Sequence, residues 1–295
     1  MRKGGLGAGR ERVDRRTLEG GLSHEDTQGG GYFWSDHDAD PELTRLKLIE
    51  QFNDPSTFRL LDAIGVAEGC RCLEVGAGAG SVARWLSERV GPAGKVVAAD
   101  LDVRFLGDIS AHNVEVRRCD ITQDHIEPSS YDLVHARNLL MHLRDPVAVL
   151  RRLTAALKPG GWLMIEDVDN GTVESADPAH PFAAAFDLCA QARIKFLLAG
   201  GIMDLRYGRT LPVHMQQLDL IDMGNEAVAL VGPGDSPVSQ LMIQSFRPMD
   251  DALVANGVVG KSDAADAQAA FDDPSFLYRC GLIVATWGRK PSRDI

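Results

Sequence analysis

A glycine-rich segment, Leu-Glu-Val-Gly-Ala-Gly-Ala-Gly from Leu73 to Gly80, has the residue types and spacing that most directly indicate chemistry. Its apolar start predicts a buried strand, and its glycines let the backbone turn sharply and approach a ligand. The next apolar run, residues 96–99, ends in Asp100. A carboxylate at that point can accept hydrogen bonds from both hydroxyls of a ribose. The pattern therefore predicts a site for an adenosine-containing cofactor.

The loop spacing and the acid before it discriminate between cofactors. Dinucleotide sites usually read G-x-G-x-x-G and present a helix N-terminus to a pyrophosphate, whereas here the glycines are Gly76, Gly78 and Gly80. Glu74 would repel a pyrophosphate and attract a cation such as the amino group of S-adenosylmethionine. The other interpretation of the loop is a tight strand-to-helix turn that holds no ligand.

Strand and helix patterns continue to alternate downstream of this loop. Residues 114–120 read as a third strand that ends in Asp120, and residues 131–137 read as a fourth. Residues 146–157 have the apolar spacing of a helix, and after a Lys-Pro-Gly-Gly turn residues 162–167 read as a fifth strand. Strands that alternate with helices in this way predict an α/β fold with a parallel sheet.

With these elements in order, the chain resembles the class I S-adenosylmethionine-dependent methyltransferases, whose fifth strand is typically introduced by a turn like residues 157–161. It is most similar to an actinobacterial-type subgroup that methylates small molecules. That similarity extends from about Asp40 over nearly all of the chain and rests on residues 42–61, 72–86, 114–120, 135–137, 142–143, 159–162, 208–212 and 286–291. It implies a doubly wound, mostly parallel seven-stranded sheet of the Rossmann-like methyltransferase type, with N-terminal helices and a helical cap insertion.

The resemblance also implies a set of residues that bind S-adenosylmethionine. They are Glu74, Gly76, Ala77, Gly78, Gly80, Asp100, Leu101, Asp120, Ile121, Ala136 and Arg137. The glycines would cradle the methionine part, Glu74 would support its ammonium group, Asp100 would take the ribose and Asp120 with Ile121 would bracket the adenine. From the residues alone, Asp100 could instead cap a helix and Asp120 could open an Asx turn, while Asp102 could share the ribose.

Three residues are candidates for the acid–base chemistry of methyl transfer. His142 is the first candidate for a general base, because it follows the fourth strand by one turn. Glu166 and Asp167 end the fifth strand at the same mouth, and one of them would face the pocket since strand side chains alternate. A histidine that only packs a helix is an equally good interpretation of His142. No metal is expected, because Arg137 stands where metal-dependent O-methyltransferases carry an aspartate.

The chain divides by composition and pattern into five parts. We expect a flexible tail at residues 1–31, a helical segment at 32–69, the S-adenosylmethionine-binding core at 70–169, a helical cap for the substrate at 170–225, and a C-terminal part at 226–295 that completes the sheet. The last part includes predicted strands at residues 226–231 and 282–287. Asp54-Pro55 is expected to break the helical segment in two.

The substrate site should be roofed by residues absent from a minimal βα core. Residues 181–207 are expected to form this roof together with the aromatic cluster at 32–34. That cluster could serve as a lid over the cofactor or simply anchor the tail. The roof expectation requires residues 181–207 to lie on the cofactor's side of the sheet.

Composition restricts the partners. The chain has 31 basic and 42 acidic residues, for a net charge of −11, which argues against nucleic acid because phosphates need a basic footprint. No apolar run approaches the roughly 20 residues of a membrane span, and the start lacks the apolar core of a signal peptide. Five cysteines without a C-x-x-C pair favour reduced thiols. We expect a cytoplasmic enzyme with no membrane partner.

The predicted function is methyl transfer from S-adenosylmethionine to a small organic molecule, with secondary metabolism as a setting. A protein that keeps the fold and binds the cofactor without methyl transfer, as a cyclase or a non-catalytic partner, has the same binding residues and stays open. A nicotinamide-dependent oxidoreductase is disfavoured by the loop spacing and by Glu74. The oligomeric state is open as well, with a homodimer as one option.

Overall fold

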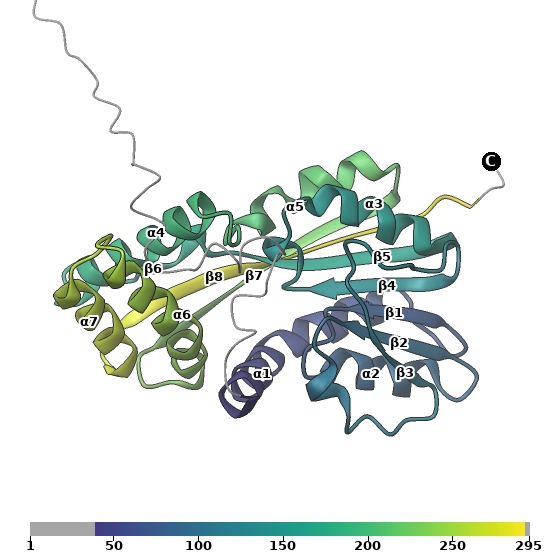
Figure 1. Ribbon diagram of the computed structural model, residues 1–295, viewed down its shortest axis with the longest axis horizontal. Helices are drawn as coiled ribbons and strands as arrows, with labels where there is room; N and C mark the ends of the chain where they lie inside the picture. The colour runs from purple at the N-terminus through teal and green to yellow at the C-terminus, as the bar shows by residue number, and fades with distance from the viewer. Residues whose placement is uncertain (1–38, 293–295) are drawn as a thin grey trace, which may run out of the picture.

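The computed structural model describes residues 39–292, which form one mixed sheet with helices on both faces (Figure 1). In these residues the sheet has eight strands in the order β3-β2-β1-β4-β5-β8-β6, and β7 pairs with β8. The strands are β1 Arg71–Val75, β2 Lys95–Asp100, β3 Val114–Arg118, β4 Tyr131–Arg137, β5 Leu157–Asp169, β6 Glu174–Ser175, β7 Ile221–Pro233 and β8 Leu277–Arg289. Strands β1 to β5 run parallel, while β8 is antiparallel to β5, β6 and β7. The Rossmann-like fold is confirmed, with the two-residue β6 in addition to the seven predicted strands.

The helices cover the sheet in two layers (Figure 1). They are α1 Ala39–Ala63, α2 Ser81–Val90, α3 Pro146–Ala156, α4 Ala183–Ala199, α5 Tyr207–Met215, α6 Pro237–Ala255 and α7 Lys261–Ala269. In Figure 1, α3, α4 and α5 lie above the sheet, and α1 and α2 lie below it. Within the described residues, no helix combines the length and the apolar character needed to cross a membrane.

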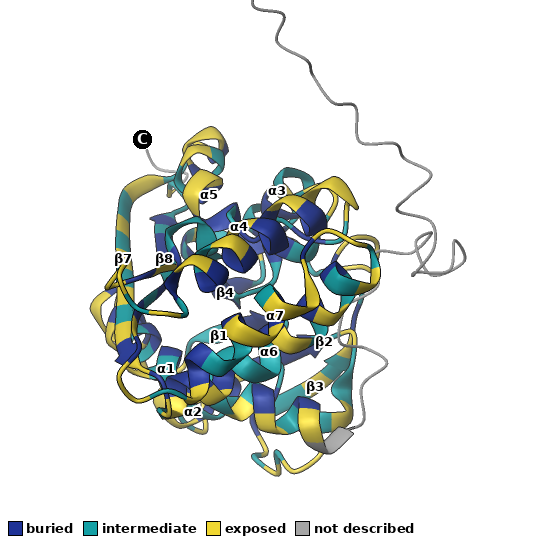
Figure 2. Ribbon diagram, turned by 90° about the vertical axis from the view of Figure 1, so that its left-hand side faces the viewer, coloured by how far each residue is buried: buried dark blue, intermediate teal, exposed yellow. Residues whose placement is uncertain are grey.

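The central strands are apolar on both sides, as strands buried between two helical layers must be. Leu73 and Val97 belong to the core cluster that includes α3 and α4, whereas their neighbours Cys72 and Val96 belong to the cluster that includes α1 and α2. Figure 2 shows the buried residues concentrated in the sheet and the outward sides of α2, α5 and α7 exposed. Because both faces of these strands are packed against helices, their carboxyl ends are held in fixed positions.

The predicted break at Asp54-Pro55 is wrong, because α1 continues through Pro55. Proline removes one backbone hydrogen bond inside a helix and normally bends or ends it. Here the side chains around it bind the helix to the sheet. The Asp54 carboxylate accepts hydrogen bonds from Ser81 and Arg137, both at 2.9 Å, and the Thr57 hydroxyl donates to Glu166 at 2.6 Å. These tertiary contacts offset the local preference for a break.

The last two long strands extend well beyond their predicted limits. Strands β7 and β8 each have 13 residues and pair with each other over most of their length. Between them the chain forms α6 and α7, and α6 packs against α1. The C-terminal part thus completes the sheet and also brings a helix to the carboxyl ends of the parallel strands.

Candidate active site

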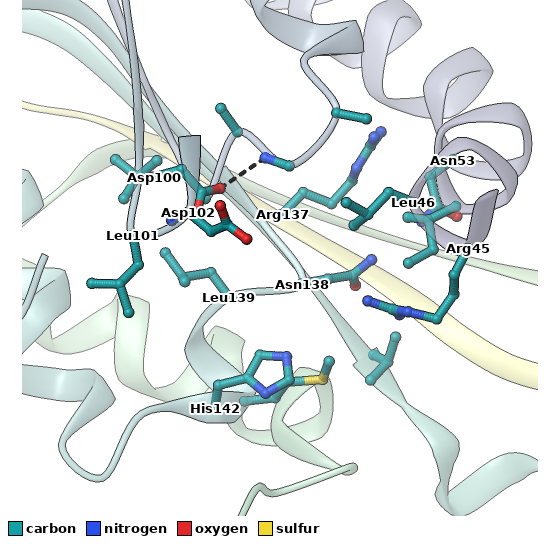
Figure 3. Close-up of a pocket in the computed structure, with 18 of the residues that line it drawn as sticks. Arg45, Leu46, Asn53, Asp100, Leu101, Asp102, Arg137, Asn138, Leu139 and His142 are labelled. Carbon is teal, nitrogen blue, oxygen red and sulfur yellow. Dashed lines mark hydrogen bonds between the residues drawn. The ribbon is translucent and has the colours of Figure 1, made fainter. Parts of the chain in front are cut away.

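A cavity of about 1030 Å³ opens at the carboxyl ends of β1 to β4. Its lining includes the last residue of each of these strands, Val75, Asp100, Arg118 and Arg137. It continues past the loop after β4 to α1, α6 and the β7–β8 pair. Ligands of open α/β sheets bind at this edge. Figure 3 shows the residues at its centre.

The glycine loop forms one wall of the cavity. Gly76, Gly78 and Gly80 have φ angles of 72°, 54° and 88°, a left-handed conformation that glycine adopts without strain. The N–H of Gly76 donates to the Ala99 carbonyl, and the N–H of Gly78 donates to an Asp100 carboxylate oxygen, both at 2.8 Å. Gly76, Ala77 and Gly78 line the cavity, while Gly80 shapes the loop from behind, since a Cβ there would lie 2.8 Å from Ile109.

Asp100 joins this loop to the end of β2 (Figure 3). One carboxylate oxygen accepts from Gly78 and the other accepts from the N–H of Asp102 at 2.9 Å. Burial raises the pKa of Asp100, and the backbone hydrogen bonds oppose that rise. Each oxygen keeps a lone pair for a further donor. Asp102 is engaged with Arg104, whose hydrogen bonds lower the pKa of the Asp102 carboxyl.

Asp120, Ile121 and Leu101 all line the cavity. The Asp120 carboxylate also accepts from the N–H of Thr122 at 2.9 Å, so the Asx turn that the sequence allowed is present. Hydrogen bonding to Thr122 lowers the pKa of Asp120. Ala136, in contrast, is fully buried within β4 and does not line the cavity.

A histidine that the sequence reasoning missed holds Glu74. The Nδ1 atom of His135 lies 2.6 Å from Glu74, and its Nε2 lies 3.1 Å from Glu166, with all three side chains almost completely buried. Burial alone would lower the pKa of His135, but the two glutamates outweigh it and raise that pKa to about 9. Burial raises the pKa of Glu74, which lines the cavity. The pairing follows from strand register, because Glu74 is directly opposite His135.

The expectation that Glu166 or Asp167 faces the pocket is wrong, because neither lines the cavity. Glu166 is covered by α1 through Thr57 on one face of β5. Burial raises the pKa of Glu166, but the hydrogen bond and charge of His135 outweigh burial and lower it. Asp167, on the other face, accepts from the N–H groups of Leu140 and Met141 at 2.9 and 3.2 Å. Both carboxylates therefore support the site from behind.

Burial raises the pKa of Asp167 to about 7, against the backbone donors that would lower it. A carboxyl with a raised folded-state pKa stabilises the fold fully below its unfolded-state pKa, and that contribution is lost as the pH rises through the folded-state value. We expect the wild type to lose stability between about pH 4 and pH 7 through this group. Asp167→Asn should remove that loss, so that the variant becomes more stable relative to the wild type as the pH rises.

Urea unfolding of both proteins at half-unit pH steps measures this difference. Its expected slope is up to about 1.4 kcal/mol per pH unit. A difference that is constant from pH 4 to pH 7 would show that Asp167 titrates as an ordinary carboxyl.

His142 does line the cavity, as predicted for a group that meets the acceptor. It ends the short 3-10 helix Leu140–His142, directly after β4. Enclosure in the cavity wall, with the positive charge of Arg45 nearby, lowers the pKa of His142 to about 3. The imidazole is therefore neutral at physiological pH and offers a lone pair to a hydrogen-bond donor.

The predicted roof is largely wrong. Within residues 181–207 only Leu205 lines the cavity, because α4 packs against α6, α7 and β6. The aromatic cluster at residues 32–34 and the tail at 1–31 lie outside the described residues. The walls that face the cofactor loop come instead from α1 and α6.

Two other lining residues were missed. Arg45 is buried on α1 and binds Glu42 through Nε and a terminal nitrogen, at 2.8 and 2.7 Å. Asn138, the first residue after β4, has a φ of 53°, and its buried amide oxygen has no hydrogen-bond partner among residues 39–292. A left-handed asparagine next to a strand end was the available signal, since such conformations cluster at functional sites.

The arrangement of hydrogen-bond acceptors fits S-adenosylmethionine. The Glu74 carboxylate suits an ammonium group, and Asp100 has acceptor capacity for ribose hydroxyls. Arg137, whose guanidinium binds Asp54 at 2.9 Å, lines the cavity between them. The cavity volume of about 1030 Å³ exceeds the range of about 300 to 1,000 Å³ that is usual for a single ligand.

Comparison with known proteins agrees with this geometry. The family model described as "Methyltransferase domain" matches residues 36–203. Methyltransferase str2 of Strobilurus tenacellus is 30% identical over 76% of this chain and 84% of its own length. Methyltransferase GfsG of Streptomyces halstedii is 23% identical over 84% of each chain. A match to the ubiquinone biosynthesis O-methyltransferase of Leptothrix cholodnii covers only 57% of that relative.

Solved structures show the same fold at low sequence identity. The YcgJ protein of Bacillus subtilis superposes with a TM-score of 0.54 at 14% identity, over 81% of this chain and 99% of that one. Phosphoethanolamine N-methyltransferase 2 of Haemonchus contortus, which holds S-adenosylhomocysteine, gives 0.51 at 17% identity over 85% of this chain and 58% of that one. The chain belongs to the class I S-adenosylmethionine-dependent methyltransferases, and its cofactor is S-adenosylmethionine.

Proposed function

We propose that the protein methylates a small organic molecule of secondary metabolism and belongs to the small-molecule, actinobacterial-type subgroup. The observation that carries the proposal is the extent of the cavity, which continues from the glycine loop to a second part between α1, α6 and β8. At about 1030 Å³ it offers room for an acceptor beside the cofactor. The relatives that match most of this chain are named methyltransferases as well.

The cofactor supplies an activated methyl group when it is bound, so the protein contributes mainly position. In the proposal, Glu74 and the loop from Gly76 to Gly78 hold the methionine part, and Asp100 with Leu101 holds the ribose. Asp120 and Ile121 hold the adenine, and Arg137 fixes the carboxyl end of β4. His142 takes the proton that the acceptor loses, once methyl transfer has made that proton strongly acidic. Four further residues act only by shaping or supporting these groups. They are Gly80, Ala136, Glu166 and Asp167.

The cofactor assignment of Asp100 is tested by calorimetry with S-adenosylhomocysteine. A hydrogen bond to a charged acceptor contributes roughly 1.5 to 3 kcal/mol, so Asp100→Ala should weaken binding by at least about tenfold. Asp102→Ala is the matched control, since Asp102 already binds Arg104. If Asp100→Ala keeps its affinity and Asp102→Ala binds more weakly, then Asp102 and not Asp100 binds the ribose.

The activity is tested by supplying the full chain with methyl-labelled S-adenosylmethionine and fractionated extracts of small metabolites. We expect label in an organic-soluble product, and less label with Asp100→Ala. Tighter binding of NAD than of S-adenosylhomocysteine would overturn the function altogether.

A further inference from the structure

The part of the cavity beyond the cofactor loop is predominantly apolar. Its walls carry large side chains from α1, β7, α6 and β8, and they include Phe52, Leu230, Leu241, Met242, Phe246 and Ile283. Leu241 and Phe246 also belong to the buried core. We call this part the apolar chamber. Burial of apolar surface is the dominant favourable term for a ligand in such a chamber.

Two arginines of the cavity lining, Arg45 and Arg137, are bound to carboxylates. Arg45 binds Glu42 through two nitrogens, and Arg137 binds Asp54. Arg45 and Glu42 are both nearly fully buried. An acceptor with a phosphate or carboxylate would have to compete for these pairs or bury an uncompensated charge, which is costly. The chamber therefore favours a neutral molecule.

Asn138 lies where the apolar chamber meets the cofactor loop. Its N–H donates to the Glu166 carbonyl at 2.8 Å, which fixes the backbone, and Figure 3 shows its amide in the same cavity as Arg45 and His142. The amide oxygen is buried and has no partner in the described part of the chain. Buried polar atoms are almost always hydrogen-bonded, and an amide oxygen can only accept. A ligand group that reaches this oxygen must therefore be a donor.

We propose that the acceptor is a neutral molecule with an extended apolar body and a hydroxyl group, and that Asn138 binds this hydroxyl as hydrogen-bond acceptor. The apolar chamber takes the body, and the amide sets the hydroxyl at the boundary with the cofactor loop. The inference rests on the proposed function, because it names the class of the methyl acceptor. It makes Asn138 a substrate-binding residue and Met242 one of the apolar residues that contact the body.

Binding of 4-alkylphenols and of the matching 4-alkylanisoles to the full chain saturated with S-adenosylhomocysteine tests the proposal by calorimetry. We expect phenol affinity to rise about two- to fourfold for each added methylene from methyl to pentyl. Each phenol should bind about tenfold more tightly than its methyl ether, which cannot donate. In Asn138→Gly the preference for the phenol should disappear while the gain with chain length stays. Glycine adopts the φ of 53° without strain, so this variant keeps the backbone.

Two control variants separate the two halves of the proposal. Ser245→Ala removes another polar group that lines the cavity and should leave the phenol preference intact. Met242→Gln should reduce the gain per methylene and keep the phenol preference. Ethers that bind the wild type as tightly as phenols, an affinity that is independent of chain length, or weaker S-adenosylhomocysteine binding in Asn138→Gly would each overturn the proposal. Labelled methyl transfer to a charged metabolite would overturn this inference and leave the proposed function standing.

Discussion

His142→Ala is expected to lower kcat by about a hundredfold or more and to leave the affinity for S-adenosylhomocysteine unchanged. Removal of a general acid or base typically costs about 10² to 10⁴ in rate. The side chain lines the cavity and is neutral at physiological pH, because burial and Arg45 lower its pKa to about 3. Such a weakly basic imidazole accepts a hydrogen bond readily but takes up a full proton only from a strongly acidic group. We therefore expect an effect near the lower end of that range.

The pH dependence of the same variant distinguishes a lowered from an ordinary histidine pKa. With a pKa of about 3, His142 stays neutral from pH 5 to pH 8, so the ratio of wild-type to variant kcat should be constant over that interval. If this ratio decreases as the pH is lowered below about 6.5, His142 becomes protonated in the range of an ordinary histidine. His125→Ala, at an exposed position outside the cavity, is the matched control and should keep full activity.

The parallel core of the fold could be predicted because its signals are local. Each central strand is a short apolar run, and β4 matches its predicted limits of 131–137. The glycine loop and Asp100 are likewise close in sequence to the strands that position them. Their φ angles and their mutual hydrogen bond agree with what glycines and an acid at those places imply.

The parts of the site that could not be predicted depend on contacts between distant segments. The chamber wall combines α1 with α6, and no local pattern says which helix an apolar face will meet. Alternation along β5 correctly puts Glu166 and Asp167 on opposite faces, but α1 covers one face and the 3-10 helix Leu140–His142 covers the other. Because β5 is covered on both faces, neither carboxylate reaches the cavity.

The same tertiary pairing creates a polar chain from the cofactor loop to α1. It runs from Glu74 through His135 and Glu166 to Thr57, whose hydroxyl oxygen also accepts from Arg137 at 2.8 Å. Its members come from β1, β4, β5 and α1, so it forms only when the sheet register and the helix position are both correct. Groups of this kind are costly when only partly satisfied.

His135→Leu should therefore destabilise the protein by about 3 to 5 kcal/mol, because it leaves two buried glutamates without their shared cationic partner. At roughly 2 to 4 °C per kcal/mol for a domain of this size, the melting temperature should fall by about 10 °C. Glu174→Ala is the control, since its exposed ion pair with Arg279 should contribute less than about 1 kcal/mol.

The pH dependence identifies the origin of this loss. His135 has a folded-state pKa raised to about 9, so its stabilisation is complete below the unfolded-state value of about 6.5 and is lost as the pH rises through 9. The wild type should thus lose stability between pH 6.5 and pH 9, and His135→Gln, which does not titrate, should lack that slope. If His135→Gln and the wild type lose stability in parallel over this interval, the imidazole is neutral, and one of its nitrogens accepts from a protonated glutamate, Glu74, whose pKa is raised by burial. In that case Glu74 would present a protonated carboxyl to the cavity, and the attraction between Glu74 and the ammonium group of the cofactor would have to be abandoned.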